Sequence, residues 1–187
     1  MDKWQKIQES GKIYELFREA HQQFFAFWYK HDFLHAEWWF GVFILGAPWV
    51  FWIWYRQKES TMRLLHAGMF MMWISFFLDY LGAAVGLWHY AGKLTPTMAG
   101  YIPLNFAALP VITMILLQWR PALSKYWKGL IFGLFNAYVG EPLYVLLGIY
   151  VMTGWKYHYS VPIYFLLFLI AHRIAYSHWY EPITKNE

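Results

Sequence analysis

The sequence predicts an all-α fold: a bundle of five transmembrane helices preceded by an amphipathic N-terminal helix. The 187 residues are 59% hydrophobic and 14% charged, whereas a typical soluble domain is about 25% charged. The apolar residues come in long blocks, and about 20 apolar residues in a helix are enough to cross a bilayer. Trp and Tyr crowd the block ends, as they do at the headgroup level of membrane proteins.

Five apolar blocks make up the predicted transmembrane domain, residues 37–179. Short polar linkers such as RQKESTMR and AGKLTPTMA separate the blocks. Residues 1–36 precede this domain, and a short tail, residues 180–187, follows it. The predicted spans are Trp38–Tyr55, Leu65–Trp88, Gly100–Trp119, Lys128–Met152 and Ser160–His178.

The N-terminal segment, residues 1–36, has the pattern of an amphipathic helix. Ile13, Phe17, Phe24 and Trp28 recur at near-helical spacing, and charged residues fill the other faces. Such a pattern is typical of a helix that lies in the membrane interface. A helix packed across the end of the bundle is the alternative.

Lysine and arginine in the short loops predict the orientation, because cytoplasmic loops are enriched in them. The first and third predicted loops carry three each, whereas the second and fourth carry only Lys93 and Lys156. We therefore expect a multi-pass protein of the cell membrane with its N-terminus outside and its C-terminus cytoplasmic. Because the basic residues lie in short loops between apolar blocks, membrane topology explains them better than nucleic-acid binding does. The predicted partner is therefore the lipid bilayer and not a nucleic acid. The oligomeric state is left open.

Three charged residues lie within the predicted spans: Asp79, Glu141 and Arg173. A charge at mid-bilayer costs about 2.5–3.5 kcal/mol on insertion scales, so such groups face the bundle interior and find partners. Counted from the loops at 1.5 Å per residue, all three lie roughly 22–26 Å below one surface. We predict a buried site centred on a Glu141–Arg173 ion pair, with Asp79 beside it. Other predicted members are His172, Asn105 and Asn136.

Small residues and prolines accompany these acids. Gly68 and Gly82 share a helical stripe with Asp79, and Gly133 shares one with Glu141. These stripes predict close helix contacts at the glycines and inward-facing carboxyls. Pro142 follows Glu141 directly and predicts a kink that frees a backbone carbonyl near Ala137 or Tyr138. A purely structural ion pair that fixes helix register is the alternative interpretation of the site.

Some of the histidines are candidate ligands for a metal ion or a haem. His31 and His35 are one helical turn apart, with Asp32 and Glu37 nearby, and this spacing is the candidate for a divalent metal site. Haem b requires histidines that face each other from different spans, and the histidines of the predicted spans lie at unequal depths. No cofactor is predicted, with haem b or a divalent metal as the alternatives.

These observations favour transport or binding of a small or lipid-like ligand, coupled to protonation of the buried acids. A membrane enzyme that acts on a lipid-soluble isoprenoid or acyl substrate is the first alternative, with Asp79 or Glu141 as general acid. A structural or partner-binding subunit is the second. The chain has no cysteine, which excludes a thiol nucleophile.

The stretches LDYLGAAVGLWHY, YIPLNFAALP and GEPLYVLLG, together with the span layout, resemble a family of small uncharacterised multi-pass membrane proteins of spore-forming Gram-positive bacteria. The resemblance covers Trp38 to Trp179 and implies no activity. A fainter similarity is to the small membrane lycopene cyclases, which combine a span-two acid, a Trp-x-Tyr and a proline followed by paired acids. In this chain Leu104 and Asn105 follow Pro103, so the paired acids of the cyclases are missing.

Overall fold

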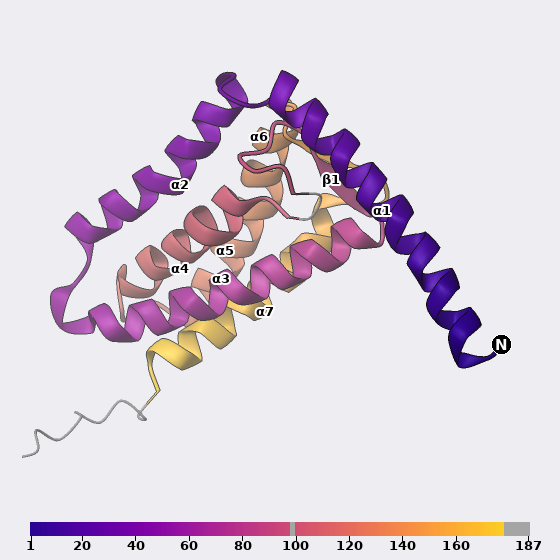
Figure 1. The fold of residues 1–187 in the computed structure, drawn as a ribbon. Coiled ribbons are helices and arrows are strands. Elements are labelled where there is room, and N and C mark those ends of the chain that lie inside the picture. The colour runs from indigo at the N-terminus through magenta and orange to yellow at the C-terminus, as the bar shows by residue number, and fades with distance from the viewer. Residues whose placement is uncertain (98–99, 178–187) are drawn as a thin grey trace, which may run out of the picture.

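The structure is a computed structural model that describes residues 1–97 and 100–177. This part of the chain is mostly helical, as predicted (Figure 1). The end of the fifth predicted span and the tail 180–187 lie outside the described residues. The α-helices are α1 (Lys3–His31), α2 (Ala36–Tyr55), α3 (Thr61–Ala84), α4 (Leu109–Gln118), α5 (Lys125–Phe135), α6 (Glu141–Leu146) and α7 (Tyr157–Ala175). Between them lie the 3₁₀-helix η1 (Lys58–Ser60), the π-helices η2 (Leu104–Ala108) and η3 (Asn136–Gly140), and the strands β1 (Trp88–Tyr90) and β2 (Tyr150–Met152).

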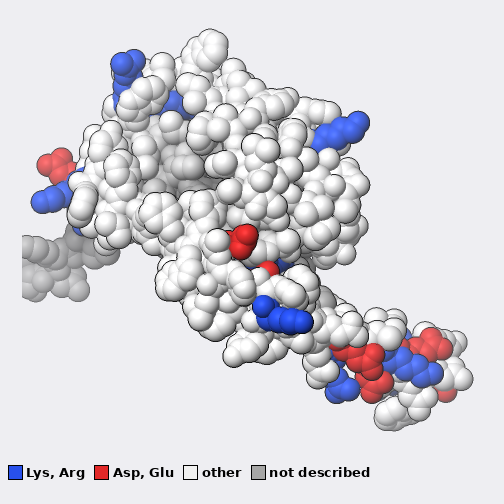
Figure 2. All heavy atoms as spheres, turned by 90° about the horizontal axis from the view of Figure 1, so that it is seen from above, with Lys and Arg blue, Asp and Glu red and all other residues white. Residues whose placement is uncertain are grey.

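Within residues 1–97 and 100–177, four helical stretches are long and apolar enough to cross a membrane: Ala36–Tyr55, Lys58–Ala84, Lys125–Leu146 and Tyr157–Ala175. The third predicted span is a shorter apolar helix, Leu104–Gln118. Large apolar side chains on these helices are exposed, such as Trp54 at 84% and Phe43 at 63%. Charged side chains gather on α1 and at a few peripheral points, and the rest of the face in Figure 2 is uncharged. These features are compatible with a multi-pass membrane protein.

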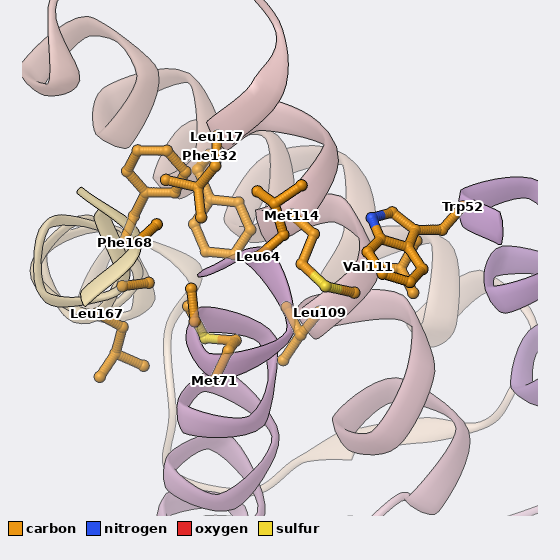
Figure 3. Close-up of a cluster of buried hydrophobic side chains, with 13 residues drawn as sticks. Trp52, Leu64, Met71, Leu109, Val111, Met114, Leu117, Phe132, Leu167 and Phe168 are labelled. Atoms are coloured by element: carbon orange, nitrogen blue, oxygen red, sulfur yellow. The ribbon is translucent and has the colours of Figure 1, made fainter. Parts of the chain in front are cut away.

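The bundle is built from α3, α4, α5 and α7. Helix α3 packs against α4 and α7, and α5 packs against α7. Side chains from these helices and from α2 meet in one apolar core, which includes Trp52, Met71 and Phe168 (Figure 3). A Cβ at Gly68 would lie 2.8 Å from Met114 Sδ of α4, and one at Gly133 would lie 2.8 Å from the Val161 carbonyl of α7. The predicted close helix contacts therefore occur at these two glycines.

Two prolines inside apolar helices are each preceded by a π-turn. Before Pro110, the Leu109 N–H donates to the Leu104 carbonyl, five residues back. A proline cannot donate a backbone hydrogen bond, and its ring crowds the carbonyl four residues before it. The wider π-turn accommodates that ring, and the freed Phe106 carbonyl accepts a 2.9 Å hydrogen bond from Trp49 Nε1 of α2. The first proline thus joins α2 to the bundle.

The same arrangement recurs before Pro142. The Glu141 N–H donates to the Asn136 carbonyl across η3, and Glu141 begins α6. The helix therefore departs from α-helical geometry next to the proline where a kink was predicted, in the form of a π-turn. Such turns are frequent at functional sites, because they re-aim the side chains that follow them.

Helix α1 begins with a capping box, in which the Asp2 carboxylate accepts from the Trp4 and Gln5 N–H groups. It leads away from the bundle, and its C-terminal end is attached (Figure 1). There the Trp28 Nε1 donates to the Lys93 carbonyl at 2.8 Å, and the Trp38 Nε1 of α2 donates to the Leu94 carbonyl at 3.0 Å. Two indoles therefore fix the α1–α2 junction to the segment that follows β1.

Candidate functional site

A cavity of about 380 Å³ is lined by residues of α3, η2, α4, α6 and α7, and residues of β1 and β2 also form part of its wall. Its volume is within the range of about 300–1,000 Å³ that is common for ligand pockets. Apolar and aromatic side chains form most of its wall. The polar side chains in the wall are Ser75, Asp79, Tyr90, Asn105, Glu141, Tyr144, Tyr150, Ser160 and Tyr164, together with the indoles of Trp88 and Trp155.

Asp79 is held by four hydrogen-bond donors. Its Oδ1 accepts from Trp88 Nε1 at 2.9 Å and from the Tyr90 hydroxyl at 2.8 Å, both on β1. Its Oδ2 accepts from the Tyr101 backbone N–H at 2.9 Å and from Asn105 Nδ2 at 2.5 Å. Both carboxylate oxygens are thus occupied. Asp79 joins α3 to β1 and to the start of the η2–α4 helix.

The glycines near Asp79 make this arrangement possible. Gly100 has a φ of +66°, which side chains on L-residues rarely permit. A Cβ at Gly100 would also lie 3.4 Å from Asp79 Oδ2. A Cβ at Gly82 would overlap the six-membered ring of Trp88. The predicted helix contact at Gly82 is therefore wrong, because a strand side chain fills the space that we assigned to a neighbouring helix.

Glu141 lies in the same cavity but in a different environment. Its polar neighbours are the hydroxyls of Ser160 and Tyr164 on α7. Its Oε2 is buried and has no hydrogen-bond partner among the described residues. The Ser160 hydroxyl also accepts a 2.8 Å hydrogen bond from Trp155 Nε1. Glu141 is therefore the wall carboxyl that has room for a further donor.

The hydroxyls of Tyr90 and Tyr150 in the cavity wall carry no charge. Burial raises the pKa of Tyr90 well above its usual value, and the nearby Asp79 carboxylate raises it further. Burial also raises the pKa of Tyr150. Both groups stay neutral at physiological pH. The residues that line the described cavity include two carboxyls and no Lys, Arg or His.

The structure brings some of the predicted site residues together around the cavity and leaves the others outside it. Asp79, Asn105 and Glu141 line one cavity. Arg173 is exposed and lies outside it, and no hydrogen bond or ion pair joins it to Glu141 among the described residues. The predicted Glu141–Arg173 ion pair at the centre of the site is therefore wrong.

Glu141 and Arg173 do not lie at the same depth, contrary to the prediction from the sequence, because the segments between the helices are not helical. Glu141 lies five residues before the end of α6, and β2 then separates α6 from α7. Glu141 is consequently level with Ser160 and Tyr164, near the start of α7. Arg173 lies two residues before the end of that helix, about 14–20 Å further along at 1.5 Å per residue.

The other predicted members also lie outside the cavity wall. Asn136 is buried, and its Nδ2 donates to the Phe132 carbonyl of its own helix at 2.8 Å. The His172 ring stacks on Tyr176 with centroids 4.3 Å apart. Around His31 and His35, as elsewhere in the described chain, no three His, Cys, Asp or Glu residues converge in a way that could hold a metal ion.

Sequence reasoning missed the aromatic groups that complete the site. Trp88 and Tyr90 were interpreted as belt residues at the end of a helix, yet they alternate along a strand and both donate to Asp79. The Trp-x-Tyr spacing was visible and has the period of a strand, in which alternate side chains share a face. Tyr144 lies three residues after Glu141 and so shares its helical stripe. Tyr164 carried no signal, because it lies within an apolar helix among other aromatic and apolar residues.

Comparison with known proteins places the chain in no family. No protein-family model matches it, and neither a curated protein nor a solved structure is significantly similar to it.

Proposed function

We propose that this protein is a five-span integral membrane protein of the cell membrane, and that its cavity binds a small or lipid-like ligand with uptake or release of a proton. In this arrangement the Leu104–Gln118 helix is an additional membrane segment, the third in chain order. Residues 100–103, which precede it, make up for its short length. Helix α1, with Phe17 and Ile13 exposed among charged residues, lies at the membrane surface.

The observation that carries the proposal is the buried Glu141 Oε2, which lies beside a cavity and has no hydrogen-bond partner in the part of the chain that the structure describes. A buried polar group without a hydrogen bond is costly, and a carboxylate is more costly still. A proton or a donor group from a ligand relieves that cost. Asp79 has no such unpaired oxygen, because the protein supplies two hydrogen-bond donors to each of its carboxylate oxygens. This contrast favours binding at Glu141 over an acid–base pair that catalyses a reaction.

The residues at the rim of the cavity favour a ligand that enters from the lipid bilayer. Leu81 of α3 and Val85, the residue after that helix, line the cavity and are 41% and 72% exposed. Apolar residues exposed at a pocket mouth favour a ligand with an apolar part. The opening beside α3 would therefore admit an amphiphile from the hydrocarbon layer.

The test is to purify the protein in lipid nanodiscs and identify bound molecules by native mass spectrometry. A bound amphiphile is expected in the wild type and should be lost when Leu81→Trp fills the rim. Phe77→Trp is the matched control, because Phe77 is exposed on the same helix and does not line the cavity. If the wild type carries no ligand and binds no added amphiphile, the proposal is wrong and a structural subunit is favoured.

A further inference from the structure

The charges around the cavity are unbalanced. The wall contains two carboxyls, and no basic side chain is among the described lining residues. Lys93 acts on Asp79 from outside the wall, behind the Tyr90 ring. Asp79 thus has both a nearby cation and four donors. Glu141 has two neutral hydroxyls as its polar neighbours.

The wall near these carboxyls is unusually aromatic. The rings of Trp88 and Trp155 meet edge to face with centroids 5.1 Å apart, and Tyr90 and Tyr150 lie 5.2 Å apart. Aromatic faces attract cations within about 6 Å of a ring centroid, and the attraction is strongest when the site is desolvated. The six aromatic wall residues are Trp88, Tyr90, Tyr144, Tyr150, Trp155 and Tyr164.

We propose that the ligand of this cavity is an organic cation: an ammonium head on an apolar tail. The inference rests on the proposed function and names its ligand class. The ammonium donates to Glu141 Oε2 and sits against the aromatic wall. The tail lies along Ile163, Leu167 and the exposed rim at Val85.

The alternatives fit the wall less well. An anionic head would meet two carboxyls with no basic wall group to receive it. A neutral hydroxyl can donate to Oε2, but it leaves the negative charge of Glu141 uncompensated in an apolar site. An ammonium head supplies both the donor and the compensating charge.

The experiment compares three probes that share one decyl chain: decylammonium, decanol and decanoate. Binding to the protein in nanodiscs is measured by equilibrium dialysis, with empty nanodiscs subtracted. Decylammonium should bind about tenfold more tightly than decanol, the factor that corresponds to about 1.4 kcal/mol. Glu141→Gln should remove this preference and leave decanol binding in place. Glu59→Gln is the control, because Glu59 is exposed in η1 and outside the cavity.

The outcomes separate this inference from the proposed function. If decanol or decanoate binds as tightly as decylammonium to the wild type, the cation inference is overturned and an amphiphile site remains. The cation inference is also overturned if Glu141→Gln keeps the full preference for decylammonium. If none of the three probes binds, both the inference and the proposed function fail. The wild-type comparison holds even if a variant does not fold.

Discussion

Asp79→Asn should destabilise this protein strongly, although it changes only one atom of the side chain. The carboxylate accepts from two N–H groups with fixed directions, one on each oxygen: Trp88 Nε1 on Oδ1 and the Tyr101 backbone N–H on Oδ2. An amide has one oxygen and one NH₂ group. Whichever way it turns, its NH₂ group faces one of these N–H groups, and neither can reverse to become an acceptor.

The expected cost follows from these contacts. A buried donor left without its acceptor costs about 1–3 kcal/mol, and each hydrogen bond to a charged group is worth about 1.5–3 kcal/mol. Burying a neutral side chain instead of an ion recovers part of this. The Tyr90 hydroxyl and the Asn105 amide can turn to reduce the mismatch further. The net loss should be about 3 kcal/mol in the free energy of unfolding.

The matched control is the same chemical change at the other wall acid. Glu141→Gln should cost less than about 1 kcal/mol, because Oε2 of Glu141 accepts from no donor within the described chain and so has none to lose. Both variants are unfolded by SDS in mixed micelles, with unfolding followed by tryptophan fluorescence. The reasoning is refuted if Asp79→Asn stays within about 1 kcal/mol of the wild type, or if the two variants lose the same stability.

Three other changes test separate parts of the structure. Gly82→Ala should cost about 1–3 kcal/mol in the same SDS titration, since its Cβ would displace the Trp88 ring; an unchanged midpoint contradicts that packing. Burial lowers the pKa of Lys93 from 10.5 to about 8. The unfolded chain therefore binds more protons between these values, and the free energy of unfolding should rise by about 2 kcal/mol from pH of about 8 to about 10. Lys93→Met should flatten this rise, and an equal slope in the variant would exclude Lys93 as its source. On intact cells a membrane-impermeant maleimide should label Lys156→Cys and not Ser60→Cys, because basic loops are cytoplasmic; the reverse labelling would invert the proposed orientation.

The helical class and the candidate acids could be predicted from the sequence alone. Long apolar blocks with few charges must satisfy their backbone hydrogen bonds internally, and helices do so locally. An acid within such a block costs free energy on insertion into the membrane, so it is rarely present without a role. Asp79 and Glu141 could therefore be identified as site candidates without any knowledge of their contacts. Both line the cavity. The proline after Glu141 also predicted a local break, which is present as η3.

Only the tertiary structure decided how these groups are partnered. The partners of Asp79 come from β1 and from the segment before α4, between 9 and 26 residues away. Whether residues 85–90 continue the helix or turn into a strand depends on the pairing of Trp88 with Met152, which lies far away in the sequence. That pairing places Trp88 and Tyr90 against Asp79, whereas an uninterrupted helix would have spread them over two faces. Arg173 lies near the end of α7, outside the cavity, and Glu141 has no basic neighbour among the described lining residues. Local residue spacing could not show this arrangement, because it encodes helix formation but not long-range strand pairing.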